Sequence, residues 1–218
     1  MKKNLKIISI VVDLLIFILV AISCVMMFTG FAFMKGPDVS LETTGIWFLK
    51  YFTVESNIFM GIVALIFFIR KILKKKITKT LYVLRFASTS AVALTFFVVF
   101  TYLSFIAPYG VKSLIMNCNL FFHLIVPVLS MISFILFEKT NTINKKEIIY
   151  GVVPTFIYGI GYLADVLVHM ENGKVSPVYD FYYFVYYGVW TAVIAVPVLF
   201  GISYIISFVL WKLNNIKK

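Results

Sequence analysis

The residues of this chain that are suited to chemistry lie in two short polar stretches inside long apolar runs. One stretch places His123 four residues after Asn119, so the two side chains share one face of a helix. The other places Thr53, Ser56 and Asn57 at helical spacing near the start of an earlier apolar run. A threonine hydroxyl is a weak nucleophile that needs an adjacent base, and histidine, whose ordinary pKa is about 6.5, suits that task. The pattern therefore indicates nucleophilic chemistry if the two stretches meet.

The elements that must position these residues are predicted to be membrane helices. Of the 218 residues, 62% are hydrophobic and only 13% are charged, and the mean hydropathy is +1.01. Soluble domains are about 45–50% apolar and about 25% charged. A transmembrane helix needs about 20 apolar residues, and several runs reach that length, whereas the alternating segments of a β-barrel are not evident. The expected class is an all-α, polytopic membrane protein.

Six apolar runs predict a bundle of six transmembrane helices that forms a single domain over residues 1–218. The predicted spans cover residues 7–30, 46–69, 81–107, 114–137, 147–169 and 182–211. The first run begins like a signal peptide, but it is too long for one and contains Asp13, so we expect a retained helix. Asp13 and Arg85 both lie near the inner ends of their spans, and this predicts an ion pair there.

The basic residues predict the orientation of the bundle. Six spans place both termini on one side of the membrane, and 16 of the 20 Lys and Arg residues lie on or near that side. The positive-inside rule therefore predicts cytoplasmic termini in a multi-pass protein of the cell (plasma) membrane. The net charge of +11 follows from this topology and does not indicate a nucleic-acid partner. Aromatic residues at the start of the sixth span predict a belt at the membrane interface, namely Tyr182, Tyr183, Tyr186, Tyr187 and Trp190.

The two chemical stretches are predicted to lie at similar depths. Thr53 and His123 both sit in spans that descend from the outer face, roughly 10 and 13 Å below it at 1.5 Å per residue. Asp165 lies near the outer end of the fifth span, where it is a candidate to orient the imidazole. Tyr158 and Tyr162 share its helix face, and we expect them to wall a substrate pocket.

Several assignments stay open at this level. Asn57 or Asn119 is expected to donate to an oxyanion, a contribution of roughly 3–4 kcal/mol in a known case. Ser56 competes with Thr53 as the nucleophile. The sequence shows no zinc-type spacing, P-loop or dinucleotide fingerprint, so we expect neither a metal nor another cofactor. It leaves the oligomeric state open.

Around these residues the sequence resembles the androgen-induced-gene-like integral membrane proteins and their bacterial relatives. The run from Trp47 to Thr53 is similar to the aromatic approach to that family's threonine. Asn119, His123 and Pro127 are similar to its histidine segment, and the run from Gly173 to Tyr179 is similar to one of its loops. The resemblance implies hydrolysis of lipid-like esters, such as fatty acid esters of hydroxy fatty acids, with Thr53 as the nucleophile and His123 as the base.

Two departures from the family pattern and two other functions remain in view. Pro127 follows His123 by four residues rather than the five expected in the animal hydrolases, and the Phe-Thr-x-x-Ser-Asn pattern at Thr53 is typical of the bacterial branch.

Polar residues also hydrogen-bond between membrane helices without any chemistry, at about 0.6–2 kcal/mol each. The alternatives are therefore a protein that binds or transports a lipid, small solute or proton through the same cavity, and a purely structural or signalling membrane protein.

Overall fold

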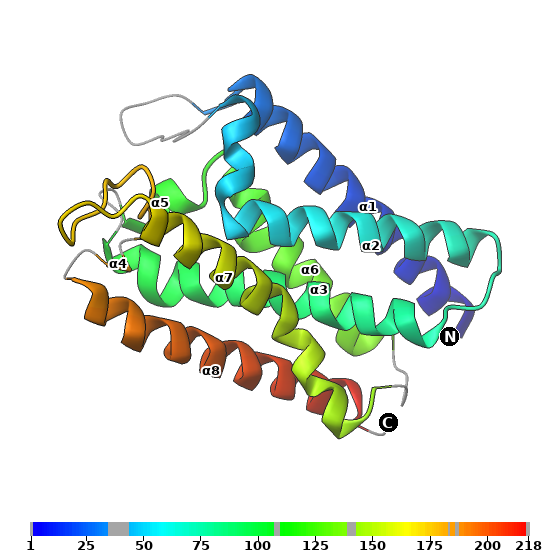
Figure 1. Cartoon of the computed structure of the whole chain (residues 1–218). Helices are drawn as coiled ribbons and strands as arrows, with labels where there is room; N and C mark the ends of the chain where they lie inside the picture. Colours follow the sequence, from blue (N-terminus) through cyan, green and yellow to red (C-terminus); the bar gives the residue numbers. More distant parts are fainter. Residues whose placement is uncertain are drawn as a thin grey trace.

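The computed structural model describes residues 2–34, 44–106, 110–138, 143–182, 184–185 and 188–216, which form a bundle of helices (Figure 1). Five helical segments in this part of the chain are long and apolar enough to cross a membrane. The first two are α1 (Lys2–Thr29) and α2 (Phe52–Ile72), and the third is α3 (Lys79–Val98) with the π-helical turn η2 (Val99–Leu103), which the short α4 (Ser104–Ile106) follows. The fourth is the 3-10 helix η4 (Lys145–Gly151) with α7 (Val153–Val168), and the fifth is α8 (Val189–Asn214).

The fourth predicted span, residues 114–137, is broken in the structure. A short helix, α5 (Gly110–Leu114), is followed by a turn, the π-helical turn η3 (Leu120–Ile125) and α6 (Val126–Leu136). The continuous apolar helix from Leu120 to Leu136 is shorter than the five spanning segments. Asn117 causes the break, because its backbone adopts a φ of 51° and its side chain bonds the backbone N–H and C=O of Met34 at 2.8 and 3.0 Å.

The last span also begins later than predicted, at Val189 instead of residue 182. The reason is Asp180, whose carboxylate accepts the backbone N–H groups of Phe184 and Val185 at 2.8 and 3.0 Å and so folds the chain into a turn. Tyr182 therefore lies outside the helix. Of the predicted interface belt, Trp190 is exposed as expected, whereas Tyr183, Tyr186 and Tyr187 lie outside the described residues.

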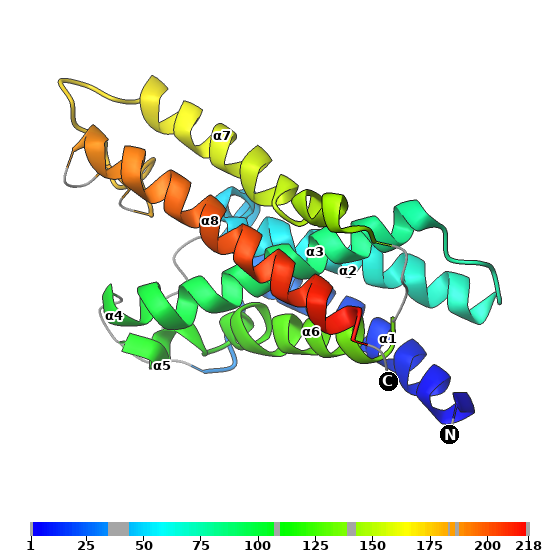
Figure 2. The same ribbon diagram turned by 90° about the horizontal axis from the view of Figure 1, so that it is seen from below.

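Small residues and a central helix set the packing. α3 contacts α2, α6, α7 and α8 and is the most buried of the spanning helices. α1 packs along α2, and Gly61 lies at that contact, where a Cβ would come within 2.9 Å of Val20 Cγ1. The start of α1 and the end of α8 lie at the same end of the bundle in both views (Figure 1, Figure 2). This end also holds the connection between α2 and α3.

The outer surface of the bundle is apolar. Less than a third of the hydrophobic window in each of α1, α7 and α8 is buried, although each window is apolar enough for a membrane span. Exposed Val11, Ile194 and Ile205 are examples. Such a surface suits hydrocarbon, where every backbone polar group must be satisfied within the helix. The fold is therefore that of a helical membrane protein.

Four charged side chains, which we call the charge quartet, meet near the end of the bundle where α1 begins; three are buried, and the Lys71 side chain is 14% exposed. Arg85 Nη2 lies 3.0 Å from Asp13 Oδ1, which confirms the predicted pair. Lys71 Nζ lies 2.6 Å from Asp13 Oδ2 and 3.5 Å from Glu138 Oε1. Arg85 Nε lies 3.0 Å from Glu138 Oε2, an ion pair whose geometry is not that of a hydrogen bond. Lys71 and Glu138 lie outside the predicted spans 46–69 and 114–137, so the sequence did not predict their participation.

Candidate functional site

The start of α2 meets η3 through one side chain, Asn57. This residue is fully buried, and its Nδ2 donates to the carbonyl of Thr53 at 2.7 Å and to the carbonyl of Phe122 at 3.1 Å. One nitrogen therefore joins the backbone of Thr53 to the residue that precedes His123. The polar stretches that the sequence identified lie on adjacent segments.

Pro127 explains why a carbonyl of η3 is available to Asn57. In the π-helical register the N–H of Val126 bonds the carbonyl of Phe121, five residues earlier. The next donor in that register is Pro127, which has no N–H, so the carbonyl of Phe122 has no partner within its own helix. Asn57 fills this position. The π-turn and the side chain from α2 thus form one structural unit, which we call the α2–η3 junction.

His123 lies in this π-turn and is 6% exposed. Its Nδ1 lies 2.5 Å from the carbonyl oxygen of Leu114, at the end of α5. A carbonyl only accepts hydrogen bonds, so Nδ1 carries the proton and Nε2 keeps its lone pair. Because the fourth span is broken, the chain returns through α5, and the carbonyl of Leu114 at its end fixes the tautomer of the imidazole.

Thr53 and Ser56 differ in how their hydroxyls are used. The hydroxyl of Ser56 is buried and lies 3.1 Å from both the carbonyl of Thr53 and the hydroxyl of Thr95 on α3. Thr53 is half-buried, and its own hydroxyl has no hydrogen-bond partner among the residues that the structure describes. No hydrogen bond joins the side chains of Thr53 and His123 in the same part of the chain. The Thr53 hydroxyl is therefore available for chemistry, whereas the Ser56 hydroxyl is already hydrogen-bonded.

The two asparagines are also distinguished. Both hydrogens of the Asn57 amide are donated to carbonyls, so in this structure the side chain has no free donor for an oxyanion. Its Oδ1 is buried without a partner. Asn119 is half-buried at the start of η3, and its side chain makes no capping hydrogen bond there. Of the two, only Asn119 has a side-chain amide that donates no hydrogen bond to the residues that the structure describes.

The structure does not give Asp165 the predicted role of orienting the imidazole. Its side chain is 48% exposed and lies 3.3 Å from Nδ1 of His169, one turn later on α7. The His169 ring in turn stacks on Tyr179 with centroids 3.6 Å apart. Since Nδ1 of His123 bonds the carbonyl of Leu114, the orienting contact comes from the backbone of α5.

A cavity of about 460 Å³ lies beside the junction, between α2, α3 and α7, and we call it the α2 cavity. Ser56 and Glu55 line it from α2, and Tyr158 lines it from α7. Tyr162 does not line it, since its hydroxyl donates to Asp180 and its ring packs within an aromatic cluster. Its other lining residues are Phe52, Phe59, Val83, Leu84, Ala87, Tyr150, Val153, Pro154 and Ile157.

The chain before α8 covers the start of α2, a feature that sequence reasoning missed. The Tyr182 hydroxyl accepts the backbone N–H of Phe52 at 3.0 Å, and Tyr158 donates to the carbonyl of Lys50 at 2.6 Å. Lys50 Nζ in turn donates to the carbonyl of Val178 at 3.3 Å. Burial raises the pKa of Tyr182 well above its ordinary range, so this hydroxyl stays neutral. The pairing of tyrosines with backbone groups leaves no pattern in the sequence.

Comparison with known proteins adds no identity. No protein-family model, no curated protein and no solved structure matches the chain. No group of three or more His, Cys, Asp or Glu side chains among the described residues is placed to hold a metal ion. The fold and the site define the class as a helical membrane protein with a polar junction buried between α2 and η3, next to an apolar cavity.

Proposed function

We propose that this protein is an intramembrane hydrolase of lipid-like esters, with Thr53 as the nucleophile and His123 as the base. The observation that carries the proposal is the Asn57 bridge, because it ties the backbone of Thr53 to that of Phe122, the neighbour of His123. A nucleophile and its base must come from segments that lie side by side. The resemblance to the androgen-induced-gene-like hydrolases supports the same pair.

The chemistry follows from the protonation state of the imidazole. Nε2 of His123 accepts the proton of the Thr53 hydroxyl as its oxygen attacks the ester carbonyl, and the bond between the carbonyl carbon and the alcohol oxygen then breaks. The imidazolium returns its proton to the departing alcohol, and water releases the acyl group by the same steps in reverse order. Asn119 is the side chain with an amide free to donate to the oxyanion. The reaction needs no metal.

The nature of the site favours a substrate from the membrane. The α2 cavity is lined mainly by apolar side chains, and exposed Ile157 and Tyr150 at its wall lie on the surface that faces lipid. The free hydroxyl of Thr53 favours this residue over Ser56, whose hydroxyl is already bonded. With both termini on the cytoplasmic side of the plasma membrane, as the distribution of basic residues predicts, the junction lies toward the outer leaflet.

The experiment is ester hydrolysis by purified protein in micelles, measured with a long-chain fluorogenic ester. Thr53→Ala and His123→Ala should each lower turnover by about 10²–10⁴-fold while leaving the thermal unfolding midpoint near that of the parent. Ser56→Ala and the exposed Thr101→Ala serve as matched hydroxyl controls and should keep their activity. Full activity in both the Thr53 and His123 variants would refute the assignment. Loss in Ser56→Ala alone would move the nucleophile to Ser56.

The second candidate is a protein that binds or transports a lipid through the same cavity without hydrolysis. The observation in its favour is that the Thr53 and His123 side chains are not hydrogen-bonded to each other in the described part of the chain. Proteoliposomes separate the two functions. A lipid ester that binds and crosses to acceptor vesicles unchanged supports transport, whereas appearance of free acid and alcohol supports the hydrolase.

A further inference from the structure

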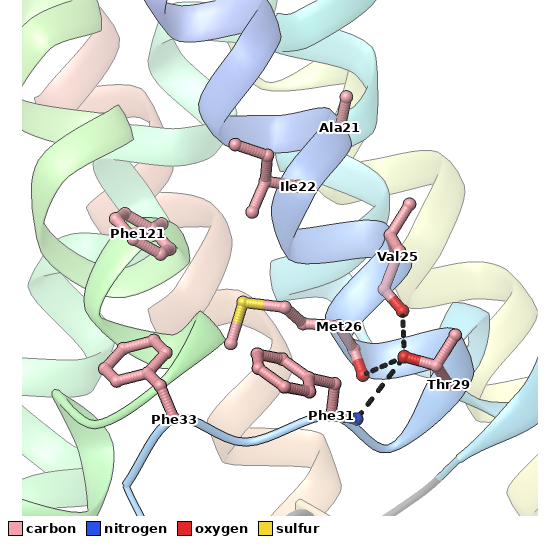
Figure 3. A pocket seen from close by; sticks show the side chains of 8 residues that line it. All are labelled: Ala21, Ile22, Val25, Met26, Thr29, Phe31, Phe33 and Phe121. Carbon is pink, nitrogen blue, oxygen red and sulfur yellow. Dashed lines mark hydrogen bonds between the residues drawn. The ribbon is translucent and has the colours of Figure 1, made fainter.

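A second cavity, of about 620 Å³, lies between the end of α1 and η3, and we call it the α1 cavity (Figure 3). It is lined by α1, by the segment that follows it and by one residue of η3. The lining residues are Ala21, Ile22, Val25, Met26, Thr29, Phe31, Phe33 and Phe121. In Figure 3 the Met26 side chain reaches from α1 into the space among the three phenylalanine rings. Ligand pockets have volumes of about 300–1,000 Å³, so the size suits a ligand.

The chemistry of the lining selects a hydrocarbon chain and excludes a headgroup. Thr29 is the one polar residue among the eight that line the cavity, and its hydroxyl donates to the carbonyl of Val25 at 2.7 Å. The same oxygen accepts the N–H of Phe31 at 3.4 Å (Figure 3). The hydroxyl is therefore committed to the backbone. A cavity without a free polar group recognises apolar surface alone.

The far wall of the cavity is held in place by the residue that breaks the fourth span. The side-chain amide of Asn117 bonds both backbone groups of Met34, which fixes the segment carrying Phe31 and Phe33 against the start of η3. The Phe33 and Phe121 rings contact each other with centroids 6.5 Å apart. The cavity is thus built before a ligand arrives, which lowers the ordering cost of binding.

The mouth of the cavity lies on the lipid-facing side of α1. Ile22, Val25 and Phe31 are 47%, 61% and 61% exposed, and in a bilayer the medium in contact with them is acyl chains. We propose that the α1 cavity binds one linear acyl chain, and that this is a chain of the ester held for the His123 site. Phe121 lines the cavity and lies in the same π-turn as His123, two residues before it, so a chain in the cavity lies against the turn that carries the imidazole. The identity of the chain as substrate rests on the proposed function.

Photolabelling tests the site independently of turnover. The protein is reconstituted in phosphatidylcholine vesicles with a fatty acid that carries a diazirine on its chain, and labelled peptides are mapped by mass spectrometry. Label should concentrate at residues 21–33 and 121, and Ile22→Trp, which fills the cavity, should lower it several-fold. Val11→Trp, an exposed position on α1 outside the cavity, should leave the labelling unchanged. Thr53→Ala should also label like the parent.

Each result is decisive. Equal labelling in Ile22→Trp and the parent, or label spread evenly over α7 and α8, would overturn the site. If the parent protein is a dimer and the Ile22→Trp variant is a monomer, a second copy covers the cavity. This result would also overturn the proposed acyl-chain site. If the parent labels as expected but hydrolyses no ester, the chain-binding site stands and the proposed function fails. If Ile22→Trp loses label yet keeps full turnover, the cavity does not serve the reaction.

Discussion

The charge quartet allows a quantitative test of the packing at the end of the bundle where α1 begins. Its two cations and two carboxylates balance, and Arg85 and Asp13 are completely buried. Replacing Arg85 with methionine leaves Lys71 alone to neutralise Asp13 and Glu138. Removing one partner of a buried ion pair typically costs about 3–5 kcal/mol, because an uncompensated charge stays behind. We expect Arg85→Met to lower the free energy of unfolding by an amount in that range.

The double variant is the sharper experiment. Arg85→Met combined with Asp13→Asn removes one charge of each sign and leaves Lys71 and Glu138, which are 3.5 Å apart, as a neutral pair. The double variant should therefore be more stable than Arg85→Met alone, a positive coupling of at least about 1 kcal/mol in a double-mutant cycle.

The measurement is equilibrium unfolding in mixed micelles, followed by circular dichroism. Lys79→Met is the control, because its ion pair with Glu147 is solvent-exposed, with 52% of the Lys79 side chain accessible, and its loss should not be measurable. If the losses in the two single variants simply add, or if Arg85→Met is as stable as Lys79→Met, the charge-balance argument is wrong.

Two further predictions concern helix contacts, measured in the same unfolding assay. Asn57→Leu should destabilise the protein by about 1–3 kcal/mol, because the carbonyl of Phe122 is left buried without a donor; a loss below the error of the assay would show that the α2–η3 junction does not depend on this side chain. Gly61→Val should cost about 1–3 kcal/mol through its clash with Val20, whereas Gly161→Ala, where nothing lies within 4 Å of the new methyl group, should be neutral. Equal effects of the two glycine substitutions would contradict the close approach of α1 and α2.

Much of the fold was predictable from local properties, and its exceptions have identifiable causes. Five of the six predicted spans correspond to helices of spanning length in the described chain. The fourth predicted span does not correspond to a helix of that length, because hydropathy does not detect the backbone turn at Asn117 that separates α5 from η3. The start of the sixth was wrong because Asp180 uses its carboxylate to cap a turn inside an aromatic stretch.

The candidate site was predictable only in part. The helical spacing of Thr53, Ser56 and Asn57 and the depth of His123 predicted that these two segments meet, and the Asn57 bridge joins α2 to η3. The sequence did not predict the hydrogen-bond partners of the individual side chains. Asp165 turned out to pair with its own helix neighbour, while the contact that orients the His123 ring comes from a backbone carbonyl, a group that every residue carries.

The sequence by itself determined that this is an all-helical membrane protein whose polar residues gather at two depths. Hydrophobicity accumulates residue by residue, and the thickness of a bilayer converts its run length into spans. Only the tertiary structure decided which side chains meet, that Lys71 and Glu138 complete the Asp13–Arg85 pair, and that the Ser56 hydroxyl is hydrogen-bonded while that of Thr53 has no partner among the described residues. These facts depend on the rotation and order of the helices, which packing sets and composition does not encode.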